Sequence, residues 1–419
     1  MTILKAVHIR RFKGIDDVII ENCASVNAFY GRNNAGKSTI LHALDLAGLA
    51  LSTKNWNQFQ PKLEIKDMFH EAGPFEIELT YEDGKHLTVR QGADGIRPAF
   101  DPPTPNEEQK FRSIYLVSDA GLGAARPHGM TPKNVMQYIE QRNFSAINGL
   151  DILYAMKYYA LKSERGFQES DYQQIIDDII GFFPEVKEIK SELTEENFPT
   201  LTYNEYGREL DLIYAGTGLR HFVDIFVKTV LSRASVVLID EPEIGLHPSL
   251  QRELLAHLLK LNEKKGTQFF IATHSPVFLS EAGNVSLFVM QNIEGKRDVL
   301  SVNRDLVNTF WSDLGIRPSD LFQNDVVVLV EGQQDVIFFE CVLELYGEEF
   351  RNIAVGVVQY GGDAASGIID GKINVGNIVS GSSPRLWVRD RDSSPKKRPA
   401  PNATKFKNAL KKTGRNAIS

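Results

Sequence analysis

Two groups of residues in this sequence of 419 residues have the types and spacing for chemistry on phosphates. The first lies in GRNNAGKS, from Gly31 to Ser38, which fits the pattern G-x-x-x-x-G-K-S. In such a loop the glycines let backbone N–H groups wrap around phosphates, the lysine contacts the β- and γ-phosphates, and the serine hydroxyl binds Mg²⁺. We therefore predict a nucleoside triphosphate site. Its residues are Gly31, Asn33, Asn34, Ala35, Gly36, Lys37, Ser38 and Thr39.

Two motifs further along the chain supply the other groups that a triphosphate site needs. In VVLIDEPE, four apolar residues predict a buried strand that ends at Asp240, and open α/β sheets bind ligands at this end of their strands. We expect Asp240 to hold Mg²⁺ through water and Glu241 to orient or deprotonate the attacking water. In IATHSP the next apolar strand likewise ends in a polar residue, His274. We predict that His274 senses the γ-phosphate.

The second group consists of carboxylates that follow two more apolar strands. Glu331 ends DVVVLVE, whereas Asp390 and Asp392 follow the strand in PRLWVRDRD. Two acids at i and i+2 face the same way at a strand end. Together with Glu331 they can bind Mg²⁺ or Mn²⁺ and activate water against a phosphodiester. Asp335 is a further candidate metal ligand, and the alternative is that the two aspartates are only loop charges beside two arginines.

The remaining patterns predict the α/β fold that positions these groups. From about 131 to 192 the apolar spacing predicts helices, which interrupt the nucleotide-binding motifs. The Pro- and Gly-rich stretch 92–110 predicts a loop. Strands are predicted in 74–90 (a hairpin that turns at 82–84), 111–117, 234–243, 266–276, 325–332 and 384–392.

The phosphate loop, VVLIDEPE and IATHSP resemble the motifs of ABC-type ATPases. That family also carries a signature at a helix N-terminus, and YAGTGLRHFVDIF stands in this place, although it departs from the usual Leu-Ser-Gly-Gly. The resemblance assigns Gly216, Thr217 and Gly218 to the nucleotide of a second protomer. It implies ATP as the nucleotide and a head-to-head homodimer. It also implies a loop between the protomers at 243–255, and 111–125 is the candidate region for the family's glutamine loop.

The carboxylate group resembles the Toprim domain, with Glu331, Gly332, Asp390 and Asp392 as the matching residues. An ATPase followed by a Toprim domain is the arrangement of the OLD (overcoming lysogenisation defect) family of ATP-dependent nucleases, and it is similar to the Gabija and PARIS phage-defence ATPases. The resemblance covers nearly the whole chain. It implies an ATP-controlled, metal-dependent nuclease that acts on phage or other foreign DNA, with a companion defence protein as an open question.

The resemblance also sets the expected domains. We expect an ABC-type ATPase domain at 1–320, with a helical insertion at about 131–200 for dimerisation or as an arm. A Toprim-like domain is expected at 321–419. It is expected to be incomplete, because the sequence after the D-x-D strand holds a helix and little more.

Composition and charge limit the function classes. The chain has 42% hydrophobic residues and no apolar run long enough to span a bilayer, and its two cysteines lack metal-site spacing, so we expect a cytoplasmic protein. The net charge is −7, but 381–419 holds eleven Lys/Arg against two Asp. This basic end suggests DNA as a partner, or it is simply a solvated tail.

Four functions are compatible with these motifs. The first is an ATPase-regulated Toprim nuclease. The second is an ATP-driven sensor or scaffold that binds a protein or nucleic acid without cutting. A DNA-repair ATPase that binds ends is less compatible, because 50–210 lacks sustained heptads. A transporter subunit is the least compatible, because the chain carries a second domain.

Overall fold

The computed structural model divides the chain into two compact units, 1–30 with 36–286, and 31–35 with 287–419. The predicted domain boundaries remain a prediction. The residues that the structure describes are 4–31, 33–52, 73–92, 95–101, 111–117, 131–140, 144, 147–162, 164, 166, 168–193, 199–205, 207–232, 234–275, 277–278, 285–293, 296–302, 326–330, 332–345, 355–359 and 385–387.

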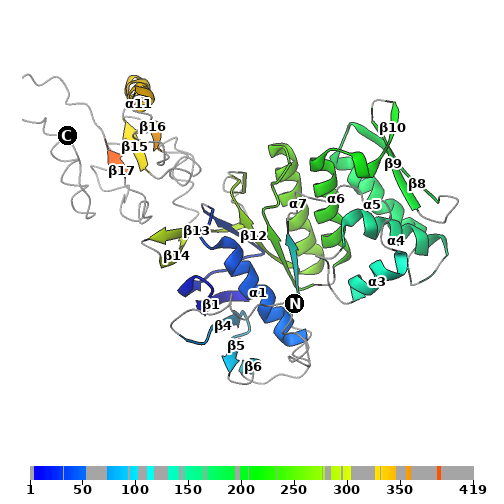
Figure 1. Ribbon diagram of the computed structural model, residues 1–419, viewed down its shortest axis with the longest axis horizontal. Helices are drawn as coiled ribbons and strands as arrows, with labels where there is room; N and C mark the ends of the chain where they lie inside the picture. Colours follow the sequence, from blue (N-terminus) through cyan, green and yellow to red (C-terminus); the bar gives the residue numbers. More distant parts are fainter. Residues whose placement is uncertain are drawn as a thin grey trace, which may run out of the picture. The chain divides into compact units, whose positions relative to one another are not determined.

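Four parallel strands form the centre of the first unit (Figure 1). They lie in the order β3 (Val26–Tyr30), β12 (Gln268–Thr273), β11 (Val236–Asp240) and β7 (Ser113–Val117). Strands β3 and β12 are buried along their whole length, and β11 is buried up to its last residue, as their apolar runs predict. Because the strands are parallel, their carboxyl ends meet at one edge of the sheet. Helix α1 (Lys37–Ser52) packs on β7, β11 and β12.

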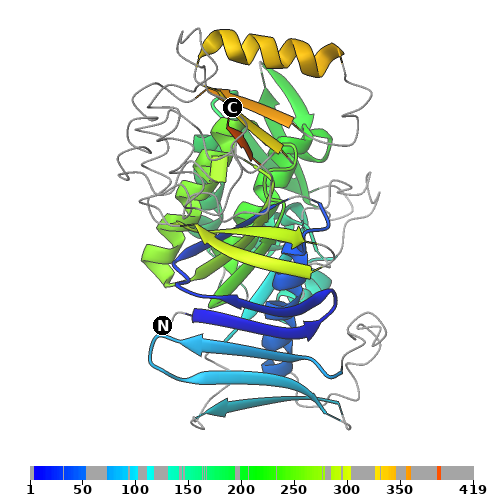
Figure 2. The same cartoon turned by 90° about the vertical axis from the view of Figure 1, so that its left-hand side faces the viewer.

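A second, antiparallel sheet lies on the other side of α1 (Figure 2). Its order is β2 (Ile15–Ile20), β1 (Leu4–Phe12), β4 (Glu76–Tyr81), β5 (His86–Gly92) and β6 (Gly95–Asp101). The predicted hairpin at 74–90 is confirmed as β4 and β5.

The prediction of a loop at 92–110 was wrong for the strand β6. Pro98 lies opposite Val89 in this strand. Proline cannot donate a ladder hydrogen bond, and an edge strand tolerates it because one side of the strand has no partner. Strand β6 is the last strand of its sheet, so the proline signal marked an edge and not a loop.

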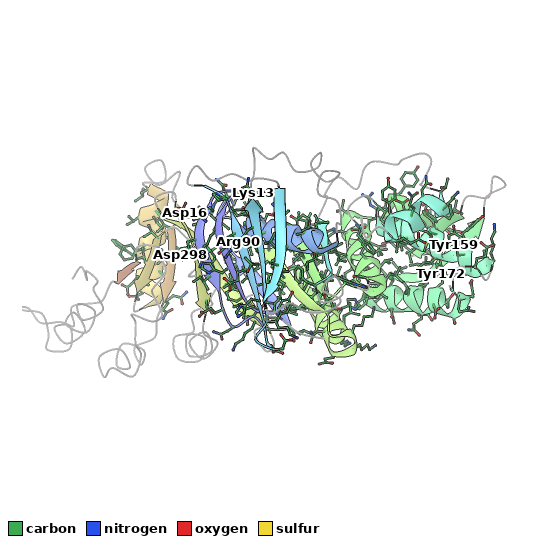
Figure 3. All side chains as sticks on the ribbon, turned by 90° about the horizontal axis from the view of Figure 1, so that it is seen from below. Lys13, Asp16, Arg90, Tyr159, Tyr172 and Asp298 are labelled. Atoms are coloured by element: carbon green, nitrogen blue, oxygen red, sulfur yellow. The ribbon has the colours of Figure 1, made fainter. Side chains whose placement is uncertain are left out.

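The helical block holds α3 (Pro132–Glu140), α4 (Gly149–Leu161) and α5 (Glu169–Phe182). Figure 3 labels Tyr159 and Tyr172 on the last two of these helices. Helix α4 begins with a capping box, in which Asn148 accepts from the N–H of Asp151 and the aspartate accepts in return. Apolar side chains on α4 and α5 are buried, which confirms that the 3.6-residue spacing there belongs to helices.

The predicted helical pattern to residue 192 was wrong at its end. Residues 186–193 form β8 (Val186–Leu193), in a sheet of order β10 (Arg208–Asp211), β9 (Pro199–Glu205), β8. The register shifts between Val186 and Glu188, which marks a bulge. Because of this extra residue, Val186 and Ile189 are both buried at a spacing of three, which imitates the period of a helix.

Two long helices complete the first unit. Helix α6 (Thr217–Leu231) follows a short 3₁₀ turn (Leu212–Tyr214) and is buried over most of its length. It lies beside α7 (Pro248–Lys265), as Figure 1 shows. Helix α7 ends at Gly266, whose φ of 67° is the left-handed conformation that glycine adopts without strain.

The second unit contains a hairpin and a small parallel sheet. The hairpin is β13 (Val285–Ile293) with β14 (Lys296–Val302). The sheet has the order β16 (Val355–Gln359), β15 (Val326–Val330), β17 (Arg385–Trp387), and α11 (Gln333–Leu345) packs on β15 and β16. The strand predicted in 325–332 is thus confirmed as β15, and the described residues of the strand predicted in 384–392 form β17. No helix among the described residues is long and apolar enough to cross a membrane.

Candidate nucleotide-binding site

The phosphate loop joins β3 to α1 and depends on glycine at its two ends. Gly36 has a φ of 103°, which a residue with a Cβ rarely adopts, and its carbonyl accepts the N–H of Thr39 to begin the helix. A Cβ on Gly31 would lie 2.6 Å from the carbonyl oxygen of Met290. The pattern GRNNAGKS therefore forms the strand-loop-helix that anion binding at a helix N-terminus needs.

The middle of the loop contacts the hairpin β13–β14. The side-chain oxygen of Asn34 lies 3.4 Å from Nη2 of Arg297, and Asn34 itself has a φ of 63°. Asparagine tolerates this left-handed conformation better than most residues. Asn33 and Asn34 are exposed, whereas Ala35 and Gly36 are buried.

Lys37 is the first residue of α1 and is only 5% exposed. Its Nζ lies 2.8 Å from Nε2 of His274. Burial lowers the pKa of Lys37, because the ammonium is withdrawn from water, and the charges of Glu241 and Asp240 oppose this shift. A buried cation at a helix N-terminus is a strong attractor for a phosphate group.

His274 follows β12 and connects the lysine to an acid. Its Nε2 lies 3.4 Å from Oε1 of Glu241, in addition to the contact with Lys37. Burial and the charge of Lys37 lower the pKa of His274, which favours the neutral ring. A neutral imidazole can accept a hydrogen bond at its unprotonated nitrogen, so the ammonium of Lys37 can donate one to Nε2 of His274.

Asp240 ends β11 at the same edge of the sheet. Its Oδ2 accepts a hydrogen bond of 2.8 Å from the hydroxyl of Tyr115. Its Oδ1 is buried and has no hydrogen-bond partner among the residues that the structure describes. A buried carboxylate oxygen of this kind requires a partner, and Mg²⁺ with its water shell prefers oxygen ligands. Asp240 therefore fits a magnesium ion, while Ser38 as a second ligand remains a prediction.

Glu241 and Glu243 follow in the loop after β11. Glu241 has a φ of 51°, a conformation that costs free energy for a residue with a side chain and is frequent at functional sites. Its side chain is 39% exposed, so water reaches it. Glu243 accepts the N–H of His274 at 2.5 Å, and burial raises its pKa. Sequence reasoning missed Glu243, which is the third acid of DEPE and had no further signal in the sequence.

The glycines assigned to the signature lie at the start of α6, as their spacing predicts. Gly216 is the N-cap, is exposed and makes no side-chain capping bond. Thr217 is also exposed. Gly218 is different, because a Cβ there would lie 2.5 Å from the carbonyl oxygen of Gly245. Close packing of two backbones thus explains Gly218, while the role of all three residues toward a nucleotide remains a prediction.

The predicted carboxylate group is only partly described. Glu331, Asp390 and Asp392 lie outside the described residues, so their predicted cluster remains untested. Asp335 is described, and its Oδ2 accepts the N–H of Gly332 at 3.0 Å. This bond from the third helical residue back to the N-cap is one half of a capping box, which gives Asp335 a structural role in α11.

The parallel sheet, the phosphate loop before α1 and the acids after β11 together define a P-loop ATPase. Residues 26–280, more than half of the chain, match the family described as "AAA domain, putative AbiEii toxin, Type IV TA system", and the chain belongs to this family. The predicted α/β fold and the ATPase class are confirmed.

Three relatives have sequences that are similar to this chain. Protein ea59 of Escherichia phage lambda is 24% identical, over 77% of this chain and 59% of its own length. The OLD nuclease of Thermus scotoductus is 22% identical over 94% of this chain and 82% of its own length. The ATP/GTP phosphatase of Helicobacter pylori is 23% identical over 66% and 86%. The expected resemblance to OLD nucleases is thus confirmed as a similarity.

Solved structures that are similar to this chain include SMC head domains. The SMC head domain from Thermotoga maritima has a TM-score of 0.43 at 16% identity and covers 72% of this chain and 99% of that chain. The recombination mediator protein RecF has a TM-score of 0.42 at 16% identity and covers 71% and 98%.

Proposed function

We propose that this protein is an ATPase whose nucleotide state controls a metal-dependent, Toprim-type DNA nuclease in defence against phage. Contacts among Lys37, Glu241 and His274, at distances of 2.8 and 3.4 Å, carry the ATPase part of the proposal. The nuclease part rests on the similarity to the OLD nuclease, which extends over 94% of this chain. The partners in this proposal are ATP, DNA and a second copy of the chain.

In the proposed hydrolysis each described residue has one task. Lys37 binds the β- and γ-phosphates, and the N–H groups at the start of α1 contribute to the same anion site. Glu241 orients the attacking water, because its side chain is accessible and lies beside His274. His274 contacts the γ-phosphate side of the site. Asp240 and Ser38 hold Mg²⁺, which would supply charge neutralisation for the triphosphate.

The proposed DNA cleavage depends on Glu331, Asp390 and Asp392. Carboxylates of this kind bind Mg²⁺ or Mn²⁺, which would polarise the phosphodiester. The proposed head-to-head homodimer brings Gly216, Thr217 and Gly218 of one protomer to the nucleotide of the other. ATP binding would then change the dimer and with it the access of DNA to the nuclease.

The test is cleavage of supercoiled plasmid DNA with Mg²⁺ or Mn²⁺, with and without ATP, beside a measurement of phosphate release. Wild type is compared with Lys37→Ala and Glu331→Ala. The matched control is Glu340→Ala, which removes an exposed glutamate from α11. We expect wild type and the control to cut DNA, Glu331→Ala to hydrolyse ATP without cutting, and Lys37→Ala to lose hydrolysis.

Two outcomes would overturn parts of this proposal. DNA cleavage that persists in Glu331→Ala would overturn the assignment of the Toprim-type site. ATP hydrolysis that persists in Lys37→Ala would overturn the assignment of the ATP site.

A second function is an ATPase sensor that binds a protein or nucleic acid without cutting. The relative that favours it is the ATP/GTP phosphatase of Helicobacter pylori, whose name carries no nuclease activity. Wild-type protein that hydrolyses ATP but leaves DNA intact with both metal ions would support the sensor.

A further inference from the structure

Tyr115 has a contact that the proposed hydrolysis does not yet use. The residue lies on β7, and its Cα is paired with that of Leu238 on β11. Asp240 lies two residues further along β11, so both strand positions face the same side of the sheet. The tyrosine hydroxyl reaches forward along the strand and donates a hydrogen bond of 2.8 Å to Oδ2 of Asp240.

A residue of α1 also packs against the ring of Tyr115. The ring of His42 meets it edge to face, with centroids 5.2 Å apart and planes at 66°. His42 is held in turn by Lys13, whose Nζ lies 2.8 Å from Nδ1 of the histidine. Lys13 lies in the turn between β1 and β2. The hydroxyl of Tyr115 is therefore fixed by packing between β11 and the helix that follows the phosphate loop.

The two carboxylate oxygens of Asp240 have different surroundings, and one of them is available to a metal ion. Oδ2 is occupied by the tyrosine, whereas Oδ1 is buried with no hydrogen-bond partner among the described residues. A carboxylate that is fixed through one oxygen cannot rotate its other oxygen away. Groups that orient a metal ligand through a hydrogen bond affect metal affinity strongly.

We propose that Tyr115 is a positioning residue that fixes Asp240 so that Oδ1 points to the magnesium of the bound nucleotide. This inference rests on the proposed ATP site and adds a residue to it. The tyrosine does not touch the reacting atoms. Its function is to keep one rotamer of the aspartate when the metal–nucleotide complex binds and leaves.

The substitution Tyr115→Phe removes the hydroxyl and keeps the ring against His42. Because a hydrogen bond to a charged group is lost, we expect the half-saturating Mg²⁺ concentration for ATP hydrolysis to rise about tenfold. ATP binding with the metal chelated should remain within about twofold, since Tyr115 acts only through the metal ligand. A change in packing alone would weaken both measurements together.

Two comparisons make the result specific. Tyr203→Phe is the matched control, because its hydroxyl lies 3.5 Å from Glu205 in the sheet of β8, β9 and β10. It should leave the Mg²⁺ dependence unchanged. Binding of Mn²⁺ in the presence of ATP, measured by electron paramagnetic resonance, gives a second readout. In an Asp240→Asn background, Tyr115→Phe should have no further effect on Mn²⁺ binding.

The outcomes separate this inference from the function on which it rests. A wild type that binds ATP with Mg²⁺, and a Tyr115→Phe variant with the same metal dependence, would overturn the positioning role alone. A wild type without Mg²⁺-dependent ATP binding would overturn the ATP site and this assignment together. If Tyr115→Phe fails to fold, the same tests apply to Tyr115→Leu, which keeps an apolar side chain on β7 and places no hydrogen-bond donor on Asp240.

Discussion

Helices α1 and α6 both begin after a glycine, but their N-termini lie in different surroundings. At the start of α1, Gly36 and Lys37 are buried and acids from β11 lie within electrostatic reach. At the start of α6, Gly216 and Thr217 are exposed, and the N-cap residue is a glycine, which has no side chain to cap the helix. The first N–H groups of any helix need a partner. The contrast agrees with the proposal that α1 completes a site within one chain and that α6 contributes its N-terminus to the site of a second protomer.

The exposed end of α6 is nevertheless joined to the acidic loop of its own chain. Gly218 packs on the backbone of Gly245, which has a φ of 72°. On the next turn of α6, Nε2 of His221 lies 3.2 Å from the carbonyl oxygen of Pro242. Whatever binds at the start of α6 thus contacts a helix that is fixed to the loop carrying Glu241 and Glu243.

The largest effect is expected at the buried helix start. Lys37→Ala removes the cation that faces the phosphates, so ATP hydrolysis should fall by at least about 100-fold. Binding of a fluorescent ATP analogue measures the loss of affinity, and release of phosphate measures the loss of hydrolysis. Lys264→Ala, an exposed lysine in the last turn of α7, is the control and should retain both activities. Equal losses in both variants would mean that net charge, and not the site, is responsible.

A smaller effect is expected at the exposed helix start. Thr217→Arg adds a long cation where the second protomer is proposed to approach. ATP binding should persist, but hydrolysis should fall about tenfold or more, because the side chain blocks close approach of the partner. Sedimentation with ATP in a Glu241→Gln background measures the dimer. Asn134→Arg adds the same charge to an exposed position on α3 and should change neither. An unchanged dimer in Thr217→Arg would contradict the assignment of α6 to the interface.

Part of the fold that positions these two helices could be predicted from the sequence. Strands β11 and β12 were found because continuous apolar runs ending in Asp240 and His274 leave little choice of structure. Strand β8 was missed because a bulge placed Val186 and Ile189 at a helical spacing. The spacing of apolar residues in a short window cannot distinguish a strand with a bulge from a helix.

The groups that support the site were harder to predict for a different reason. Tyr115 reads as a core aromatic of a strand, and its hydrogen bond to Asp240 joins residues 125 positions apart. Motifs give the groups that act on the phosphates, because their spacing is local. The residues that fix those groups come from other elements, and only the packed sheet brings them together.

The glycines of α6 allow a stability test with a built-in control. Gly218→Ala places a Cβ 2.5 Å from a backbone oxygen of Gly245, so one of the two elements must shift. Overpacking of this kind costs about 1–3 kcal/mol. Gly216→Ala meets no atom within 4 Å, so its cost should be limited to the poorer N-cap, at about 0.5–1 kcal/mol. Urea unfolding of both variants is the measurement. Equal stability of the two would show that α6 and the loop are not rigidly joined.

The smallest effect concerns an acid in the middle of each helix. In α6, Asp224 is satisfied by Lys228 at 2.8 Å and by the N–H of Gly149. In α1, Asp45 has the hydroxyl of Ser113, at 3.4 Å, as its one hydrogen-bond partner within the part of the chain that the structure describes. Burial raises the pKa of Asp45 from 3.8 to about 6, and the serine hydrogen bond opposes this shift weakly. The ionised carboxylate is therefore less stable in the folded protein than in the unfolded chain.

The sign of the pH dependence follows from the raised pKa of Asp45. Below about pH 4 the carboxyl is neutral in both states, and as the pH rises to about 6 the unfolded chain loses its proton first. Stability should therefore fall over this interval and stay lower at neutral pH. The shift corresponds to at most about 3 kcal/mol, and partial exposure of the residue reduces the expected effect to about 1 kcal/mol. Asp45→Asn should be more stable than wild type at pH 7.5 and lose this advantage near pH 4, as measured by urea unfolding, while Asp178→Asn on the surface of α5 should show no such trend. An advantage of Asp45→Asn that is equal at both pH values would assign the effect to packing and leave α1 and α6 alike in their buried acids.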